Sequence, residues 1–257
     1  MTDLSQARAV SLRGKVSAAE WQMRIDIAAC YRLVALFGMN DLVYNHISGR
    51  VPGEAGHFLI NAYGMTYDEI TASSLVKIDF EGNVVQDSGT GYGINHAGFV
   101  IHSAVHRGRP DVGCVIHTHS PAGMAVSALK CGLLPLTQNA MFFGALAYHD
   151  YEGPAIDLDE QQRLVKDLGS ASAMILRNHG VLAVGRTVCE AFVVLHWLER
   201  ACQAQVLAMN TKCIVPHERV VGLTNERYKP GQRRRIGELE WAGLLRLLER
   251  RYPGFRD

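Results

Sequence analysis

The motif His-Thr-His-Ser-Pro at 117–121 follows an apolar run and constrains the fold of this chain more than any other feature. Residues i and i+2 of an extended strand point to the same side, so His117 and His119 project together. A second apolar run, at 173–176, is followed by His179 and a glycine. Three imidazoles at two strand ends favour a first-row metal site with one open coordination position.

A competing pair of histidines lies upstream, in a segment predicted to be helical over 97–107. His102 and His106 are spaced i, i+4, which places both on one face of a helix, where they could chelate a metal. The alternative for that pair is one buried, hydrogen-bonded histidine and one surface histidine. The i, i+2 spacing on a strand favours His117 and His119 over this pair.

The size and charge of the chain limit which classes of protein it can belong to. The chain has 257 residues and is 48% hydrophobic, which suits one large domain. Lys and Arg total 26 against 25 Asp and Glu, so no overall field indicates a nucleic-acid or membrane partner. The basic cluster at 233–235 is interpreted as a solvated surface. With no CxxC pair among six cysteines, no signal core and no 18-residue apolar run, we expect a cytoplasmic protein.

The pattern along the chain predicts an N-terminal arm at 1–16 and a single α/β domain at 17–257. Capping boxes begin at Ser17 and Thr187, and they predict helices to about Gly38 and about Asn210. The segment 148–154 is predicted to be a loop. Further helices are predicted at 97–107, 121–130, 157–169 and 236–252, and strands at 44–50, 57–61, 75–79, 83–86, 112–118, 172–177 and 181–184.

Several segments, in order, resemble the class II aldolase/adducin family, most closely the adducin head domain and its bacterial relatives. The resemblance covers roughly residues 18–210. The segments that carry it are Asn45-His-Ile-Ser48, the run from Leu59 to Thr71, Asn95 to Asp111, His117-Thr-His-Ser-Pro-Ala-Gly, Lys130 to Pro135, Ala147 to Gly153 and Leu176-Arg-Asn-His-Gly180.

This resemblance implies a three-layer α/β/α fold around a central, largely antiparallel mixed sheet. It also implies a small-molecule substrate and a ring-like homotetramer with sites near the subunit boundaries. The metal ligands of the family match His117, His119 and His179 here. The resemblance implies zinc as the metal, with manganese or iron in some relatives.

The chain departs from the family's sugar-phosphate aldolases where those enzymes carry Ser-Ser-Glu. His96, Ala97 and Gly98 stand at these positions, so the phosphate-holding serines and the acid/base glutamate are absent. Tyr63 replaces the threonine of a phosphate-binding Thr-Gly. Gln138 or Asn139 occupies the region of a tyrosine that protonates the aldehyde in some relatives. We therefore expect a substrate that is not a sugar phosphate.

Three residues are candidates to replace the missing acid/base: His96, His149 and Tyr151. A structural hydrogen bond is the favoured alternative for each. The resulting prediction is a zinc-type lyase acting on a small carbonyl or hydroxy-acid substrate. Two alternatives stay open: a non-catalytic assembly module like the adducin head, and a metal-dependent decarboxylase or non-haem iron oxygenase on the same fold. A C-terminal tail with Tyr228 and the arginines at 233–235 either reaches into a neighbouring subunit or packs on its own.

Overall fold

The computed structural model describes residues 9–144, 146–153, 158–228 and 235–257. Their strands form one eight-stranded sheet in the order β4-β3-β2-β1-β5-β8-β7-β6. Every neighbouring pair is antiparallel except β6 and β7, which confirms the largely antiparallel mixed sheet. The strands are β1 His46–Arg50, β2 His57–Asn61, β3 Leu75–Asp79, β4 Val84–Gln86, β5 Cys114–Thr118, β6 Ala147–His149, β7 Ala173–Leu176 and β8 Gly180–Gly185.

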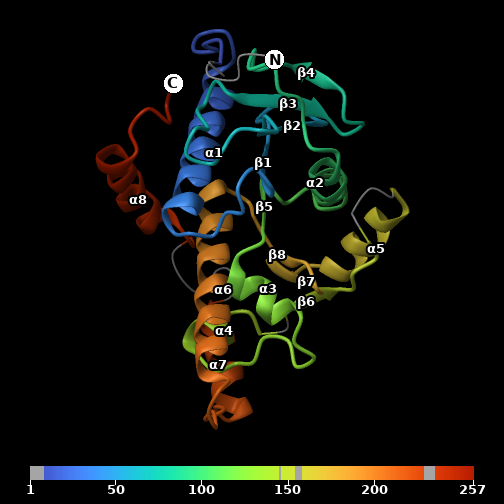
Figure 1. Cartoon of the computed structure of the whole chain (residues 1–257), viewed down its shortest axis with the longest axis vertical. Coiled ribbons are helices and arrows are strands. Elements are labelled where there is room, and N and C mark those ends of the chain that lie inside the picture. The colour runs from blue at the N-terminus through green and yellow to red at the C-terminus, as the bar shows by residue number, and fades with distance from the viewer. Residues whose placement is uncertain (1–8, 145, 154–157, 229–234) are drawn as a thin grey trace.

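Helices cover both faces of this sheet, which confirms the three-layer α/β/α fold. Figure 1 shows α2 and α5 on one side of the sheet and α1 and α6 on the other. The helices are α1 Ala18–Leu36, α2 His96–Gly108, α3 Pro121–Ser127, α4 Gln138–Phe142, α5 Leu158–Leu168, α6 Val188–Ala208, α7 Glu218–Tyr228 and α8 Glu238–Arg251.

The two faces of β5 bury different cores, because successive residues of a strand point to opposite sides. Ile116 belongs to the larger core, with residues of α1 and α6. Val115 belongs to a second core, with residues of α2 and α5. His117 shares the face of Val115 and therefore points into the layer that contains α2 and α5.

Both predicted N-caps are present, but the reciprocal half of each capping box is not: the Glu20 carboxylate accepts from Arg24 and Lys77, and that of Glu190 accepts from the Arg186 backbone N–H. The Ser17 hydroxyl accepts a hydrogen bond from the Glu20 backbone N–H at 3.1 Å, and α1 begins directly after it. The Thr187 hydroxyl accepts from the Glu190 N–H at 3.2 Å at the start of α6. Satisfying these otherwise unpaired amides fixes where each helix begins.

Three elements differ from the sequence-based expectation. The predicted loop at 148–154 begins inside strand β6, because Tyr148 and His149 pair with Ile175 and Leu176 of β7. Helix α4 is only five residues long and is capped by Thr137, so it carries little periodic signal. Helix α7 has no buried residue, so it lacks the apolar stripe by which an amphipathic helix is predicted.

The described part of the predicted N-terminal arm packs on the domain. Val10 donates its N–H to the Ser88 carbonyl at 3.1 Å, and buried Leu12 donates to the Ser73 hydroxyl at 3.2 Å. The first eight residues of that arm lie outside the described residues. Within the described chain, no helix has the length and apolar character needed to cross a membrane.

Candidate metal centre

The three predicted ligands lie where β5 ends and where β7 turns into β8. His117 is in β5, His119 follows the end of that strand, and His179 immediately precedes β8. The turn is made by Asn178, whose φ of 54° is in the left-handed region. Glycine at position 180 lets the backbone after β5 pack closely against the start of β8, since a Cβ there would lie 2.4 Å from the Thr118 carbonyl oxygen.

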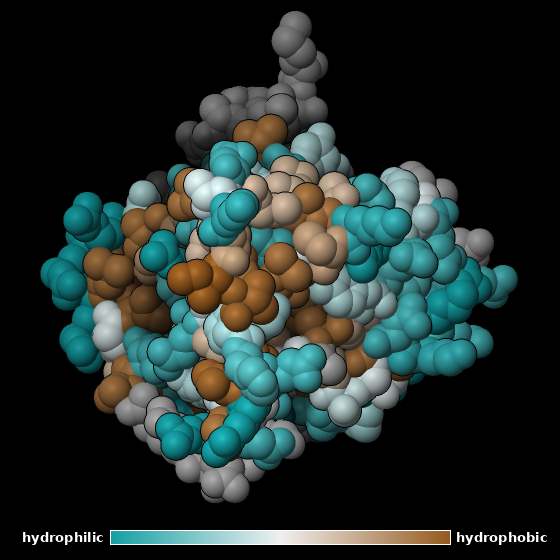
Figure 2. Space-filling model, turned by 90° about the horizontal axis from the view of Figure 1, so that it is seen from below, coloured by the Kyte–Doolittle hydropathy of each residue, from teal (hydrophilic) through white to brown (hydrophobic). Residues whose placement is uncertain are grey.

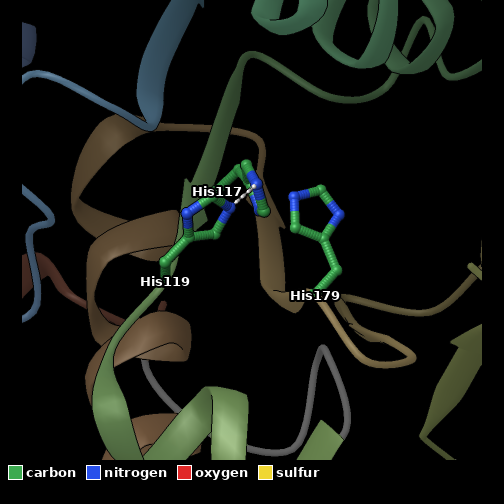
Figure 3. Close-up of side chains that lie close together, drawn as sticks. All are labelled: His117, His119 and His179. Atoms are coloured by element: carbon green, nitrogen blue, oxygen red, sulfur yellow. Dashed lines mark hydrogen bonds between the residues drawn. The ribbon is translucent and has the colours of Figure 1, made fainter. Parts of the chain in front are cut away.

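The three imidazole rings converge, as Figure 3 shows. Ring centroids are 4.8 Å apart for His117 and His119, 4.8 Å for His117 and His179, and 4.7 Å for His119 and His179. The Nε2 atoms of His117 and His119 are 3.0 Å apart. Nitrogens bound to one tetrahedral zinc are separated by roughly 3.3 Å, so this ring geometry fits a shared metal.

Contacts behind the rings orient them toward the common point. The Nδ1 of His117 lies 3.0 Å from the Val181 carbonyl oxygen and donates to it, which leaves the Nε2 lone pair free. The Nδ1 of His119 faces an Asp41 carboxylate oxygen at 3.5 Å. The His119 backbone N–H donates to the Asn45 side-chain oxygen at 3.2 Å. Two of the three ligands are therefore held from behind, as metal-binding histidines usually are.

Burial keeps these imidazoles neutral near pH 7, which is the form that binds metals. It lowers the pKa of His117 well below the ordinary value, and the nearby His179 and His119 lower it further. Burial lowers the pKa of His179 to about 4, with His119 contributing. It also lowers the pKa of His119, although Asp41 partly opposes this.

The competing histidine pair is tied to a serine of β1. The Ser48 hydroxyl oxygen lies 2.6 Å from Nδ1 of His102 and 2.8 Å from Nε2 of His106. All three side chains are buried, so the expected surface histidine is absent. Within the described chain, the only metal-ligand cluster of three or more residues is His117, His119 and His179.

The structure gives a physical reason for Gly98, where the sugar-phosphate aldolases of the resemblance carry glutamate. A Cβ at position 98 would lie 2.4 to 2.6 Å from three ring atoms of His46. The buried His46 of β1 pairs in register with His117 of β5 and shares its face of the sheet. A side chain at position 98 would therefore force the His46 ring to move. Sequence reasoning missed it, although His46 and Ser48 alternate as residues of one strand face do.

Of the three acid/base candidates, the structure brings two to the site. The exposed Tyr151 has its ring 6.0 Å from that of His179, and His149 lines the same small cavity as both. His96 is exposed at the start of α2, with its ring 5.8 Å from Phe99. Among the described ring contacts, none joins His96 to the three converging histidines. A buried carboxylate at Glu160, which sequence reasoning did not single out, lines the cavity as well.

The described C-terminal contacts favour a tail that packs on its own subunit. Gln138 donates its side-chain amide to the Tyr228 hydroxyl at 2.7 Å. The Tyr228 ring packs against Phe142 and Trp197, with centroids 5.4 and 5.8 Å away. The arginines at 233 and 234 lie outside the described residues.

Comparisons with known proteins agree with the fold. The family profile of the class II aldolase and adducin N-terminal domain matches residues 25–206. The crystal structure of an aldolase II superfamily protein from Pseudomonas syringae is 48% identical, covers 96% of this chain and all of that one, and has a TM-score of 0.90. The L-fuculose 1-phosphate aldolase of Glaciozyma antarctica is 28% identical, with 96% and 95% covered and a TM-score of 0.80.

A eukaryotic relative matches over part of its length. Rat alpha-adducin is 42% identical over 275 residues, which cover 96% of this chain and 37% of the adducin. The chain thus spans little more than a third of that protein.

Proposed function

Because the chain belongs to the class II aldolase and adducin family, we propose that it is a zinc-dependent lyase acting on a small carbonyl or hydroxy-acid substrate. The single observation that supports this most is the convergence of His117, His119 and His179 on one point. Manganese and iron are the alternative metals, since neutral imidazole binds each of them.

The residues present fit a metal that keeps an open coordination position. His117, His119 and His179 would hold it as neutral ligands, so its full charge is available to a fourth ligand. When bound, such an ion supplies Lewis-acid polarisation of a carbonyl or hydroxyl oxygen. Val181 and Asp41 keep the first two rings turned toward it. His149 and Tyr151, beside His179, are our candidates to exchange protons with the substrate, and His96 is the more distant candidate.

We propose further that the substrate is not a sugar phosphate. The imidazole of His46 fills the space that an acid/base side chain at position 98 would need. His96 and Ala97 replace the serines that hold phosphate in the sugar-phosphate aldolases of the family resemblance. The substrate in the name of the Glaciozyma enzyme belongs to that protein, whose identity to this chain is 28%.

A substrate panel tests this proposal. Zinc-loaded protein is incubated with L-fuculose and L-rhamnulose 1-phosphates, and separately with 2-hydroxy and 2-oxo acids, and consumption is followed by NMR. We expect the protein to cleave at least one of the 2-hydroxy or 2-oxo acids and neither of the two sugar phosphates. The His117→Ala variant is the control, because it lacks one ligand. Rapid cleavage of a sugar phosphate would overturn the substrate assignment. Release of carbon dioxide, or oxygen uptake with iron, would favour the decarboxylase or the oxygenase.

The identity to alpha-adducin favours a second candidate function, a non-catalytic assembly module. This candidate predicts that wild-type protein and His117→Ala form the same oligomer and that neither turns over any acid in the panel. A lyase predicts that His117→Ala keeps the oligomer and loses turnover. The same two proteins therefore separate the two functions.

Exposed apolar side chains support the homotetramer that we propose. Figure 2 shows hydrophobic residues gathered among hydrophilic ones on the face seen from below, the end where Figure 1 places α4 and α7. Around this end the exposed apolar residues include Leu207, Ile214, Val215, Val220 and Leu223. Such a surface is typical of a protein interface. Light scattering after size exclusion should give about four times 28.3 kDa; a monomer at micromolar concentration would exclude the tetramer.

A further inference from the structure

A small cavity lies beside His179, between α5 and the turn that joins β7 to β8. His149, Tyr151, Glu160 and Arg177 line it together with His179. It has room for about one water molecule. A predicted metal ligand and a buried carboxylate therefore face the same water-sized space.

Two side chains of α5, Asp167 and Glu160, lie on either side of the His149 ring and form an array with it. The Nδ1 of His149 lies 2.8 Å from an Asp167 carboxylate oxygen, and its Nε2 lies 3.5 Å from a Glu160 oxygen. Asp167 accepts the Nδ1 proton and so fixes the ring, which turns Nε2 toward Glu160 and the cavity. The side chain of His149 is 4% exposed and that of Glu160 is 10% exposed. Both Asp167 and Glu160 come from α5, seven residues apart on one helix face.

One ring nitrogen of this array faces the cavity without a hydrogen-bond partner among the described residues. It is Nε2 of His149, which is buried. Buried polar atoms are nearly always satisfied, so a water or a ligand group in the cavity would complete this one.

The other charged groups around the cavity come from two segments. Asp150 and Tyr151 follow β6, and Arg177 and His179 follow β7. Arg177 donates to the Leu129 carbonyl at 2.8 Å and lies 4.3 Å above the Tyr148 ring. Among the described ion pairs, the one that Glu160 makes is with His149. Among the described residues, no arginine or lysine forms an ion pair with Glu160, so its carboxylate faces the cavity with His149 as its charged or polar neighbour.

We propose that Glu160 is the proton acceptor and donor of the three-histidine site, with His149 and Asp167 as its positioning residues. This inference rests on the proposed function. In the forward step a substrate O–H or C–H bond breaks, and its electron pair stays on the substrate. The proton crosses the cavity to the Glu160 carboxylate, which becomes neutral. In the reverse step Glu160 returns that proton to the product. Glu160, rather than the earlier candidates His149 and Tyr151, would thus supply the acid/base group that position 98 cannot, and His149 would hold it in place.

The role of Glu160 can be tested without catalytic turnover by measuring how many protons the protein releases to the buffer when a ligand binds. Acetohydroxamic acid is the probe, because it is neutral in solution and binds divalent metals as an anion after losing one proton. Binding to zinc-loaded protein is measured by calorimetry near pH 7 in Pipes and in Hepes, which bind zinc weakly and whose ionisation enthalpies differ. Wild-type protein should retain the proton, giving equal heats in both buffers. Glu160→Gln should release about one proton per site to the buffer.

Matched variants make the result specific. Asp159→Asn changes the adjacent, exposed residue of α5 and should release as few protons on hydroxamate binding as the wild-type protein does. Asp167→Asn should release a fraction of a proton, because His149 loses its fixed orientation. Asp167 is 40% exposed, so this variant tests the array even where Glu160→Gln folds poorly. Equal proton release from wild type and Glu160→Gln would overturn the inference.

The same experiment separates this inference from the proposed function. Zinc content is measured first, and a chain that binds no zinc at the three histidines contradicts the proposed function. Zinc-loaded protein that does not bind the hydroxamate contradicts an open metal position, and with it the proposed function. Zinc and hydroxamate binding with unchanged proton counts contradicts the role of Glu160 alone.

Discussion

Two groups of histidines lie on the same side of the sheet and differ in what their ring nitrogens contact. His102 and His106 direct one nitrogen each at the Ser48 hydroxyl, which lies between them. In the other group, the Val181 carbonyl oxygen accepts from the Nδ1 of His117 and leaves its Nε2 to face His119. Burial lowers the pKa in both groups, so neutrality does not distinguish them. The two groups are distinguished by the atoms that contact the outer ring nitrogens.

This difference shows what sequence spacing can and cannot establish. Spacings of i, i+2 on a strand and i, i+4 on a helix both place two rings side by side. A metal site needs in addition a third ligand and a partner that occupies the outer nitrogen. Only the group at the end of β5 has both, and the following predictions test that distinction.

The largest effect is expected from His117→Ala. Removing one of three ligands should weaken zinc binding more than 100-fold, since changes in the outer shell alone cost about 10- to 100-fold. Competition with a chromophoric chelator measures the affinity. His102→Ala is the matched control and should keep the affinity within about threefold. Equal losses in the two variants would erase the distinction between the groups.

The contact between His46 and Gly98 should give the next largest effect. Gly98→Ala places a methyl group 2.4 Å from a ring atom of His46 and should cost about 3 kcal/mol of unfolding free energy. Adding His46→Ala should recover part of that loss, which urea denaturation of both single variants and the double variant measures. Strictly additive losses would show that the two positions do not compete for space.

The pH dependence of stability should follow the buried rings. Burial lowers the pKa of His106 to about 3 from 6.5, so only the unfolded chain takes up this proton between those values. Its contribution is therefore fully present above pH 6.5 and is lost as the pH falls toward 3. In metal-free protein, His106→Gln should reduce the loss of stability between pH 6.5 and 5 by about 2 kcal/mol.

Urea titrations at both pH values measure this change. His217→Gln, at an exposed position, is the control and should leave the pH dependence as it is in wild type. A pH dependence unaffected by His106→Gln would contradict a neutral buried ring.

The smallest effect is expected from Ser48→Ala. It removes the hydroxyl that bonds both His102 and His106 and should cost about 1.5 kcal/mol, the range for a buried polar group left without a partner. Zinc affinity should be unchanged. Thermal melting and the chelator assay report the two quantities, and a loss of zinc in this variant would assign a metal-binding role to the wrong group.

Much of the fold could be predicted from local signals. The caps at Ser17 and Thr187, and the apolar runs before His117 and His179, gave the helices and strands that carry the site. Strand β6 escaped prediction because its three residues are defined by pairing with β7, which is distant in sequence.

The candidate site shows the same limit. The three converging histidines follow from spacing and strand ends, and the family resemblance selects the same residues. His46 and Glu160 could not be identified in this way, because each acquires its setting from a distant segment. His46 meets Gly98 of α2, and Glu160 of α5 meets the cavity beside His179. Packing between elements, rather than any motif, defines what surrounds the three converging histidines.

Anomalous diffraction at the zinc absorption edge, from crystals grown with zinc, tests the central claim most directly. We predict one peak per chain, about 2.0–2.1 Å from a ring nitrogen of each of His117, His119 and His179. A peak between His102 and His106, or no peak at the three converging rings, would contradict the account.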